Sequence, residues 1–333
     1  MSVRLVAAAT PEQEMLLDTS ARFIAETCPL STVRELAEVG DRPGAAYFET
    51  AAARDTGLYS EGFMSEGQNL LSFHGRVAVV VGAGAGLGAT LARRFSSAGA
   101  SVALVARSTA SLDASGEAAR AAGGEVLTVA ADIASPPDAE RMAMAVMDRF
   151  GRIDVLVNAA FPNTAKRAVV DMDAPELEEW RRAVEIGGFG TLLTCRYVAP
   201  HMVERGAGSI VNVTSMSSRI GLAGRSEYSA GKAQAHKIAQ SLAAELGPHG
   251  VRVNCVAPGH IWSARLEGYY RSLAMQRGVE YEVVLAGYAS EMALRRPVTE
   301  DEVANAVLFL ASDLASGITG AVLDVNAGHL FTP

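Results

Sequence analysis

Three side chains with a defined spacing could together move a proton. Tyr228 and Lys232 stand four residues apart in Tyr228-Ser-Ala-Gly-Lys232, and Ser215 precedes the tyrosine by thirteen positions. Residues four apart share one face of a helix, so we expect the Lys232 ammonium to lie beside the Tyr228 phenol. A neighbouring positive charge lowers the pKa of a tyrosine, which would let Tyr228 act as a general acid or base near neutral pH.

The spacing Tyr-x-x-x-Lys is common by itself, and its meaning depends on the elements that would position it. Residues 76–81 form a β-branched run that predicts a buried strand, and residues 89–100 are compatible with a helix. The turn between them is glycine-rich, with Gly82, Gly84, Gly86 and Gly88. A strand, a glycine-rich turn and a helix in this order predict a site for the phosphates of a dinucleotide.

Strand-like and helix-like runs then alternate as far as residue 323, which predicts an α/β fold with a doubly wound parallel sheet. Strands are expected near residues 76–81, 101–106, 125–130, 153–158, 208–214, 251–256 and 321–325. The longest helices are expected near residues 174–204 and 227–247. Thr299-Glu-Asp-Glu302 has the pattern of a capping box, which predicts the start of a last helix over residues 303–310.

Composition and charge exclude several classes of protein. The 333 residues carry a net charge of −8, which argues against a general nucleic-acid surface. No apolar run approaches the ~18 residues that span a bilayer, and the N-terminus does not resemble a signal peptide. The three cysteines are too few and too scattered for a disulfide framework or a zinc site, so we expect no metal and a cytoplasmic location. Cys195 and Cys255 lie in apolar runs and are expected to be buried thiols.

Residues from about 74 to 330 resemble the short-chain dehydrogenase/reductase family. The glycine spacing Gly-x-x-x-Gly-x-Gly, Asp132 after the third strand and Asn158-Ala-Ala160 after the fourth match the family in order. Ser215 ends the fifth strand, Tyr228 and Lys232 follow, and Pro258-Gly259 comes after the sixth. The resemblance implies a Rossmann-type sheet of seven strands that binds a nicotinamide cofactor.

The resemblance also implies roles for particular residues. Tyr228 would exchange a proton with the substrate oxygen, Ser215 would hold that oxygen, and Lys232 would assist Tyr228 and bind the nicotinamide ribose. The implied cofactor-binding residues, besides Tyr228 and Lys232, are Gly82, Gly84, Gly86, Leu87, Arg107, Ser108, Asp132, Ile133, Asn158, Ala159, Ala160, Pro258, Gly259, Ile261 and Ser263. His260 follows the Pro-Gly turn and is expected near the nicotinamide end of the pocket.

The end of the second strand favours NADP(H) over NAD(H). Relatives that prefer NAD place an acidic residue at the position of Ala106, where it binds the ribose hydroxyls. Ala106 cannot do this, whereas Arg107 offers a planar fork for a phosphate and Ser108 adds a hydroxyl. We therefore expect NADP(H), and an arginine that merely ends a strand in solvent is the alternative.

Three positions depart from the family pattern. Gly187 stands where the family usually has an asparagine that holds a water of the proton relay, and glycine cannot replace that amide. Gly187-Gly188 within a helix also costs roughly 1 kcal/mol per residue relative to alanine, so we expect close packing or a local bend. Phe161 replaces a glycine and Val81 a threonine, and both changes are expected to reshape the pocket floor and its strand contacts.

A long segment, residues 262–297, is expected to form a lid of two helices over the pocket. Most of its aromatic and apolar residues would pack the lid on the core. Trp262 and Tyr269, together with Met216 after the catalytic serine, are the expected substrate contacts. These side chains predict a roomy apolar pocket for a cyclic, aromatic or long aliphatic substrate. Arg265, Arg271 and Arg277 could either bind an acidic tail of the substrate or face solvent.

Residues 1–73 lie outside this pattern and are expected to form a helical extension with a linker. Thr10-Pro-Glu-Gln13 predicts a helix start, and Pro29 a helix end. Glu14-Met-Leu, Arg22-Phe23, Pro29, Val33-Arg34 and Gly57 faintly resemble the opening helices of acyl-CoA dehydrogenases, without the flavin-binding or catalytic parts of that family.

The sequence thus predicts an NADP(H)-dependent alcohol dehydrogenase or carbonyl reductase. Its relatives pair through long helices, so we expect a homo-oligomer, a tetramer or a dimer. Two alternatives stay open: a 3-oxoacyl thioester reductase, and a cofactor-binding protein with little turnover, which Gly187 favours.

Overall fold

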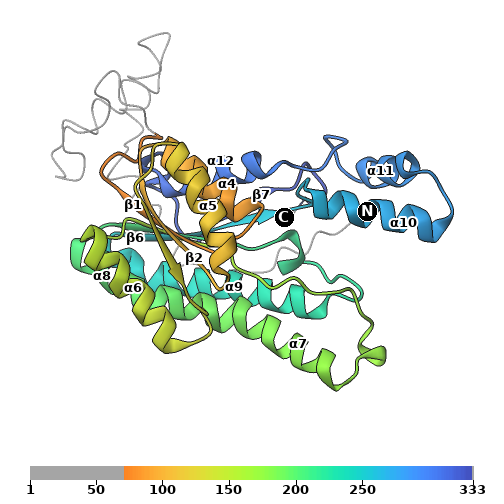
Figure 1. The fold of residues 1–333 in the computed structure, drawn as a ribbon, viewed down its shortest axis with the longest axis horizontal. Helices are drawn as coiled ribbons and strands as arrows, with labels where there is room; N and C mark the ends of the chain where they lie inside the picture. The colour runs from red at the N-terminus through yellow and green to blue at the C-terminus, as the bar shows by residue number, and fades with distance from the viewer. Residues whose placement is uncertain (1–70, 332–333) are drawn as a thin grey trace, which may run out of the picture. The chain divides into compact units, whose positions relative to one another are not determined.

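The computed structural model describes residues 71–331, which form a sheet of seven parallel strands with helices on both faces (Figure 1). The strand order is β3-β2-β1-β4-β5-β6-β7. The strands are β1 (Val77–Val81), β2 (Ser101–Ala106), β3 (Val126–Ala130), β4 (Val155–Asn158), β5 (Gly208–Val213), β6 (Val251–Pro258) and β7 (Val322–Val325). The predicted fold class is confirmed, and each predicted strand is found within about two residues of its expected position. The helices expected before residue 71 lie outside the described residues.

Helices cover the two faces of the sheet in separate layers. Figure 1 shows α4, α5 and α12 on one side of the sheet and α6, α8 and α9 on the other. The helices are α4 (Leu87–Ser97), α5 (Thr109–Ala121), α6 (Pro136–Phe150), α7 (Ala174–Val184), α8 (Thr191–Arg205), α9 (Ser226–Leu246), α10 (Ala264–Arg277), α11 (Tyr281–Ser290) and α12 (Glu300–Ala311). Short helical turns are η1 (Val169–Asp171), η2 (Glu185–Gly190), η3 (Met216–Ser218), η4 (Gly247–His249) and η5 (Asp313–Ala315).

The central strand shows how the sequence builds both layers. All five residues of β1 are buried. Ala78 and Val80 belong to the core under α4 and α12, whereas Val77, Val79 and Val81 belong to the core under α6 and α8. Successive side chains of a strand point to opposite faces, and a strand buried on both faces is therefore apolar throughout. The continuous valine run of β1 reflects its central place in the sheet.

The long helix expected over residues 174–204 is interrupted. Asp173 begins α7 with a capping box, and α8 ends at Arg205. Between them η2 is a π-helical turn that contains Gly187 and Gly188, both buried. Such wide turns interrupt helices mainly at functional sites. The expected local bend at the glycine pair is therefore present, and it has the form of a π turn.

The lid segment folds into two helices with a small core of their own. Tyr270 and Ala274 from α10 pack with Val284 from α11, and Tyr270 is fully buried. The segment expected to form a lid thus contains two helices, and α12 after it begins at the predicted capping box of Thr299 and Glu302.

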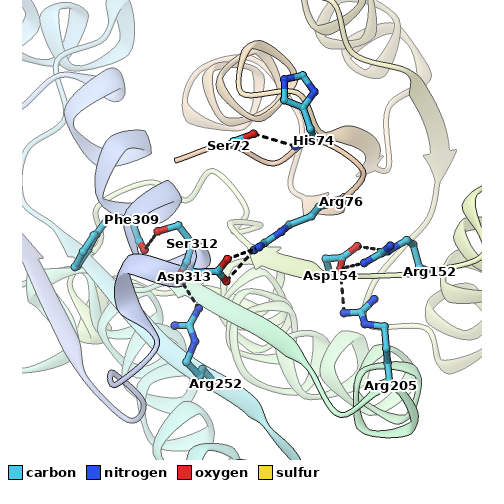
Figure 2. Close-up of polar contacts among 10 residues, drawn as sticks. All are labelled: Ser72, His74, Arg76, Arg152, Asp154, Arg205, Arg252, Phe309, Ser312 and Asp313. Carbon is cyan, nitrogen blue, oxygen red and sulfur yellow. Dashed lines mark hydrogen bonds and ion pairs between the residues drawn. The ribbon is translucent and has the colours of Figure 1, made fainter. Parts of the chain in front are cut away.

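The amino ends of the strands are fixed by arginine–carboxylate pairs (Figure 2). Asp154 precedes β4 and has a side chain only 9 % exposed. Its carboxylate accepts hydrogen bonds from the Val77 amide at 2.8 Å and from Arg152 at 2.7 and 2.8 Å. Arg205, which precedes β5, lies 3.1 Å away. This carboxylate therefore joins β1, β4 and β5 at one edge of the sheet.

A second pair lies at the same edge. Arg76, just before β1, donates to Asp313 in η5 (Figure 2). Arg252 in β6 donates instead to the carbonyl oxygens of Leu310 and Ser312. Charged side chains at this edge are thus engaged with the protein itself.

Two cysteines lie within the described part of the chain, and both carry buried free thiols, as predicted. Burial raises the pKa of Cys195 and of Cys255 to about 12. Cys28 lies outside the described residues. Within residues 71–331, no helix combines the length and apolarity needed to cross a bilayer.

Candidate active site

The predicted site residues gather at the carboxyl ends of the strands. The ends of β1 to β6 and the segments that follow them carry most of these residues, at the edge opposite the pairs of Asp154 and Asp313, and Tyr228 and Lys232 lie on α9. In open α/β sheets this is the edge where ligands bind. No group of three His, Cys, Asp or Glu residues within residues 71–331 could hold a metal ion.

The glycine-rich turn after β1 has the shape of a phosphate cradle. Gly86 has φ +90° and begins α4 without a capping side chain or an acidic residue in the first turn. The Ala89 amide donates to the Gly84 carbonyl at 3.0 Å, whereas the amides of Leu87 and Gly88 have no side-chain cap and could face an anion. A Cβ atom at Gly88 would overlap the carbonyl oxygen of Gly82, so only glycine lets α4 approach β1 this closely. Gly84 has open space on its side-chain face, and Leu87 opens the helix. This geometry fits a pyrophosphate.

The end of β2 presents a cation to the same region. Ala106 is the last residue of β2, and Arg107 after it is exposed. Arg107 has no carboxylate partner in the described part of the chain. Ser108 caps α5 by accepting a hydrogen bond from the Ser111 amide. Its hydroxyl therefore has a structural task besides any contact with a ligand.

The residues expected near the adenine and the ribose are tied into the protein. Asp132 forms an ion pair with Arg182 of α7 and accepts a hydrogen bond from the Ala134 amide at 3.1 Å. The buried Asn158 donates to the Asn212 side chain at 3.0 Å and accepts from Thr194 at 2.8 Å. Asn158 thus joins β4, β5 and α8. Ile133 is buried, and Ala159 and Ala160 are half-buried beside these residues.

The three residues that could move a proton come from two neighbouring elements. Ser215 follows β5 and is buried, and its hydroxyl oxygen accepts a hydrogen bond from the Ser217 amide at 3.2 Å. Tyr228 and Lys232 lie one turn apart on α9, with the Lys232 Nζ atom 5.9 Å from the Tyr228 ring centre. Lys232 is 5 % exposed and donates to the Val213 carbonyl at 2.7 Å.

Burial lowers the pKa of Lys232 to about 8. Water is excluded from the ammonium, and a buried cation without a carboxylate partner loses hydration energy that a single carbonyl does not replace. The amine therefore exchanges its proton close to physiological pH, which is unusual for lysine.

A phenylalanine ring fills the space next to this lysine. The Phe161 ring centre lies 5.1 Å from Lys232 Nζ, and the ring stands edge-on to Tyr228 at 5.0 Å. A Cβ atom at Gly187 would lie 2.8 Å from the Phe161 ring, and one at Gly231 would lie 2.7 Å from it. The two glycines are therefore what makes room for the ring.

Phe161 and Gly187 were separate departures in the sequence, and the structure joins them into one packing arrangement. No local pattern relates the two positions, because they lie on different elements. The signal in the sequence was indirect: a large residue in place of a small one at 161, and the reverse change at 187.

Sequence reasoning missed Arg225, which lies against the tyrosine. Its guanidinium carbon is 5.0 Å from the Tyr228 ring centre, and its Nη1 atom donates to the Thr164 carbonyl at 2.7 Å. Its position three residues before Tyr228 was the available signal.

The loop after β6 connects the sheet to the lid. Pro258 is buried at the end of the strand, and Gly259 is so close to Asn326 that a Cβ atom there would lie 2.9 Å from the Asn326 side chain. Ile261 pairs with Val298, and Ser263 caps α10 by accepting from the Leu266 amide at 3.2 Å. The turn thus holds the first lid helix in place.

His260 contacts the lid through its ring. Its Nδ1 atom lies 2.9 Å from the Tyr270 hydroxyl, and its ring lies 5.5 Å from that of Tyr288. Burial lowers the pKa of His260 to about 4. The imidazole is therefore neutral at physiological pH and joins the lid to the sheet.

The three expected substrate contacts differ in exposure. Met216 is buried beside Ser215, whereas Trp262 and Tyr269 are 37 % and 42 % exposed. A cavity of about 320 Å³ lies between Trp262, α11 and the segment before α12. Its lining residues are Trp262, Leu285, Ala289, Arg295, Arg296, Pro297 and Thr299. The lid therefore leaves a mainly apolar space next to Trp262.

Known proteins resemble this chain over most of its length. Residues 82–329 match a protein family described as enoyl-(acyl carrier protein) reductase. The cis-4-hydroxycyclohexanecarboxylate dehydrogenase of Sinomonas cyclohexanicum is 36 % identical over 262 residues, which are 78 % of this chain and 98 % of that protein.

Solved structures resemble it as well. The crystal structure of levodione reductase has a TM-score of 0.71 at 31 % identity and covers 77 % of this chain and 98 % of its own. The structure of NAD⁺-bound xylitol dehydrogenase has a TM-score of 0.70 at 26 % identity and covers 76 % of this chain and 98 % of its own.

Proposed function

The chain belongs to the short-chain dehydrogenase/reductase family, and we propose that it is an NADP(H)-dependent oxidoreductase that interconverts a ketone and a secondary alcohol. The observation that carries the proposal is the arrangement of Tyr228 and Lys232 one turn apart on α9, beside Ser215 at the end of β5. The hydroxycyclohexanecarboxylate named for one relative, together with the buried Met216 next to Ser215, favours a cyclic or otherwise bulky apolar substrate.

The cofactor would lie along the carboxyl edge of the sheet. The turn Gly82 to Gly88 and the start of α4 would hold the pyrophosphate, and the loop after β6 would lie beside the nicotinamide. When bound, a nicotinamide cofactor supplies or accepts the hydride. Asp132, after β3, and Asn158, at the end of β4, would lie beside the adenine and the ribose. Their side chains already form an ion pair and hydrogen bonds within the protein, which fix their positions.

The protein's own residues would manage the proton and the oxygen. The Tyr228 hydroxyl would give its proton to the substrate oxygen during reduction and take it back during oxidation. Ser215 would donate a hydrogen bond to the same oxygen. Lys232 would hold a positive charge one helical turn from Tyr228. Because this place is closed to water, the electrostatic interaction between the ammonium and the phenol would be strong.

Proton exchange with solvent would not pass through a side chain at position 187. Gly187 offers no amide, and Phe161 occupies the adjoining space. We propose that Tyr228, which is only half-buried, exchanges its proton on the open side of the pocket.

The preference for NADP(H) rests on the end of β2. Ala106 offers no carboxylate for the ribose hydroxyls, and the exposed Arg107 beside it suits a 2′-phosphate. The solved structure of xylitol dehydrogenase, a structural neighbour, contains NAD⁺, and a parallel measurement with NADPH and NADH distinguishes the two cofactors for this chain.

The test is oxidation of NADPH, with NADH in parallel, against cyclic, aromatic and acyl-thioester ketones. Tyr228→Phe removes the proton donor and keeps the ring, so we expect a loss of roughly 10²–10⁴-fold in kcat with cofactor binding retained. Turnover that survives Tyr228→Phe would overturn the mechanism.

The same panel separates the alternatives. Turnover restricted to acyl thioesters would identify a 3-oxoacyl thioester reductase. Tight NADPH binding without turnover of any ketone, or of the matching alcohols with NADP⁺, would identify a cofactor-binding protein.

We also propose a homo-oligomer, a dimer or a tetramer, that pairs through α7, α8 and α9. Leu177 on α7, Phe189 in η2 and Leu192 on α8 are 53 %, 45 % and 39 % exposed, which is high for large apolar side chains along one helical segment. Light scattering of wild type and Phe189→Glu tests this, because a charge in the interface would shift the assembly toward the monomer.

A further inference from the structure

Arg225 is a half-buried cation beside the tyrosine that the proposed reaction uses. Its guanidinium carbon lies 5.0 Å from the Tyr228 ring centre, and one of its amino groups donates to the Thr164 carbonyl at 2.7 Å. That single bond leaves the other donors of the guanidinium group without a partner among residues 71–331. A guanidinium group carries five N–H donors in a fixed fork, so most of its capacity is unused.

The nearest acidic neighbour in the sequence is engaged elsewhere. Glu227 is 3 % exposed and accepts a hydrogen bond from the Thr164 hydroxyl at 2.8 Å. Thr164 thus binds Glu227 through its side chain and Arg225 through its carbonyl oxygen. The two charged residues share this threonine and form no ion pair with each other.

A second arginine, Arg265, is exposed at the start of the lid segment. Arg265 lies in the first turn of α10, three residues after Trp262. Partial burial lowers its pKa first, and the positive charge of Arg225 lowers it further, while the Tyr228 oxygen acts in the opposite direction. Arg265 is therefore close enough for its charge to interact with both residues. In the described part of the chain it has no carboxylate partner.

Two like charges near one phenol repel each other, and an anion between them reduces the repulsion. Elsewhere in this chain arginines are commonly paired, as Arg271 is with Glu267 on the same helix α10. Lys232, one turn beyond Tyr228, adds a third positive charge to this part of the chain. The three cations therefore outnumber the buried Glu227 carboxylate near Tyr228.

We propose that Arg225 and Arg265 bind an acidic group of the substrate, and that the substrate is a ring ketone or alcohol that carries a carboxylate. This deepens the proposed function and rests on it. The two oxygens of a carboxylate match the fork of a guanidinium group, and paired charge-assisted hydrogen bonds fix its orientation. The anion would orient the ring so that its carbonyl oxygen meets Tyr228 and Ser215.

The test compares two ketones that differ only in charge, 4-oxocyclohexanecarboxylate and its neutral carboxamide. With the wild-type full chain we expect a KM for the carboxylate about 10–100-fold below that for the carboxamide. Arg225→Met and Arg265→Met should each raise the KM for the carboxylate about tenfold or more and change that for the carboxamide less than threefold. Arg225→Lys should recover part of the loss.

Arg277→Met is the matched control, because Arg277 ends the same helix α10. This variant removes an equal charge and should change neither KM. Equal KM values for both ketones in the wild type would overturn the proposal. An equal effect of Arg225→Met on both ketones would do so as well, because it would reveal a general role in supporting Tyr228.

A binding measurement separates this proposal from the reaction itself. Cyclohexanecarboxylate has no carbonyl in its ring to reduce, and its binding in the presence of NADP⁺ can be followed by calorimetry. Binding that Arg225→Met weakens tenfold supports the anion site even if no ketone is turned over, in which case only the proposed reaction fails. Absence of binding at about 10 mM ligand overturns the anion site, whatever the kinetics give.

Discussion

The two edges of the sheet use arginine for different purposes. At the amino ends of the strands Arg152 and Arg205 pair with the buried Asp154, and Arg76 pairs with Asp313 (Figure 2). These bonds connect strands that are distant in the sequence. Charge at this edge is neutralised within the fold.

At the carboxyl ends the arginines are divided. Arg182 pairs with Asp132, but Arg107 after β2, Arg225 before α9 and Arg265 on α10 have no carboxylate partner within residues 71–331. The Lys232 ammonium is bonded to a backbone carbonyl. Unpaired cations gathered at one edge raise the local potential and attract anions. The difference indicates that the first edge serves stability and the second serves binding, and substitutions at the two edges should separate the two properties.

The largest expected effect is at the paired edge. Asp154→Asn removes the charge that Arg152 and Arg205 share, and we expect the free energy of unfolding to fall by about 3 kcal/mol. Urea unfolding measures it, and kcat and KM should stay within threefold of wild type at a temperature where the variant is folded. Glu117→Gln, in an exposed pair with Arg120, is the control and should change stability by less than about 0.5 kcal/mol. If the folded Asp154→Asn variant lost turnover, the two edges of the sheet would not have separate roles in stability and binding.

The next effect has the opposite sign. Lys232→Met removes a buried, poorly hydrated ammonium, so we expect the variant to be about 2 kcal/mol more stable at pH 7 and inactive. The folded lysine loses its proton near pH 8, whereas an unfolded lysine keeps it to about pH 10.5. Unfolding therefore takes up a proton between these values, and wild-type stability should rise with pH relative to the variant. Parallel stability curves for the two proteins from pH 7 to 10 would contradict this.

The third prediction concerns the packing of the Phe161 ring against Gly187, next to Lys232. Gly187→Asn places side-chain atoms against the Phe161 ring, and we expect the free energy of unfolding to fall by about 1.5 kcal/mol, with a lower kcat. Phe161→Gly in the same chain removes the ring, but a Cβ atom at position 187 would still lie 2.9 Å from the Gly231 Cα atom, so this double variant should recover only part of the lost stability. Gly268→Asn, at a helical glycine with open space around it, is the control. If Gly187→Asn alone is as stable as wild type, the ring does not fill this space.

The smallest effect is expected at Arg107. Arg107→Ala removes one exposed cation, so we expect the Kd for NADPH to rise about tenfold while that for NADH stays within twofold. Fluorescence titration of both cofactors measures it, and the melting temperature should not change. An equal loss of affinity for the two cofactors would show that Arg107 does not contact the 2′-phosphate of NADPH.

Much of the fold could be predicted from local patterns in the sequence. Short apolar, β-branched runs that alternate with helix-like runs predicted all seven strands, and the capping box of Thr299 and Glu302 predicted the start of α12. The position of Tyr228 and Lys232 on one helix followed from their spacing. Such features depend on neighbours in the chain, which a sequence displays directly.

Other features depend on contacts between distant positions. The bond between His260 and Tyr270 and the packing of Phe161 on Gly187 arise only when separate elements meet. The approach of Arg265 to Arg225 joins the lid to α9 in the same way. Spacing along the chain carries no trace of these pairings, so the three-dimensional structure was needed to find them.

The ring of Phe161 makes three positions of the chain depend on one another. Cβ atoms at positions 187 and 231 would each lie within 3 Å of the ring, so a side chain at either glycine requires the ring to move. A library that varied one of these positions at a time would therefore return few active variants. Variation of the three positions together is the way to remodel this side of the pocket.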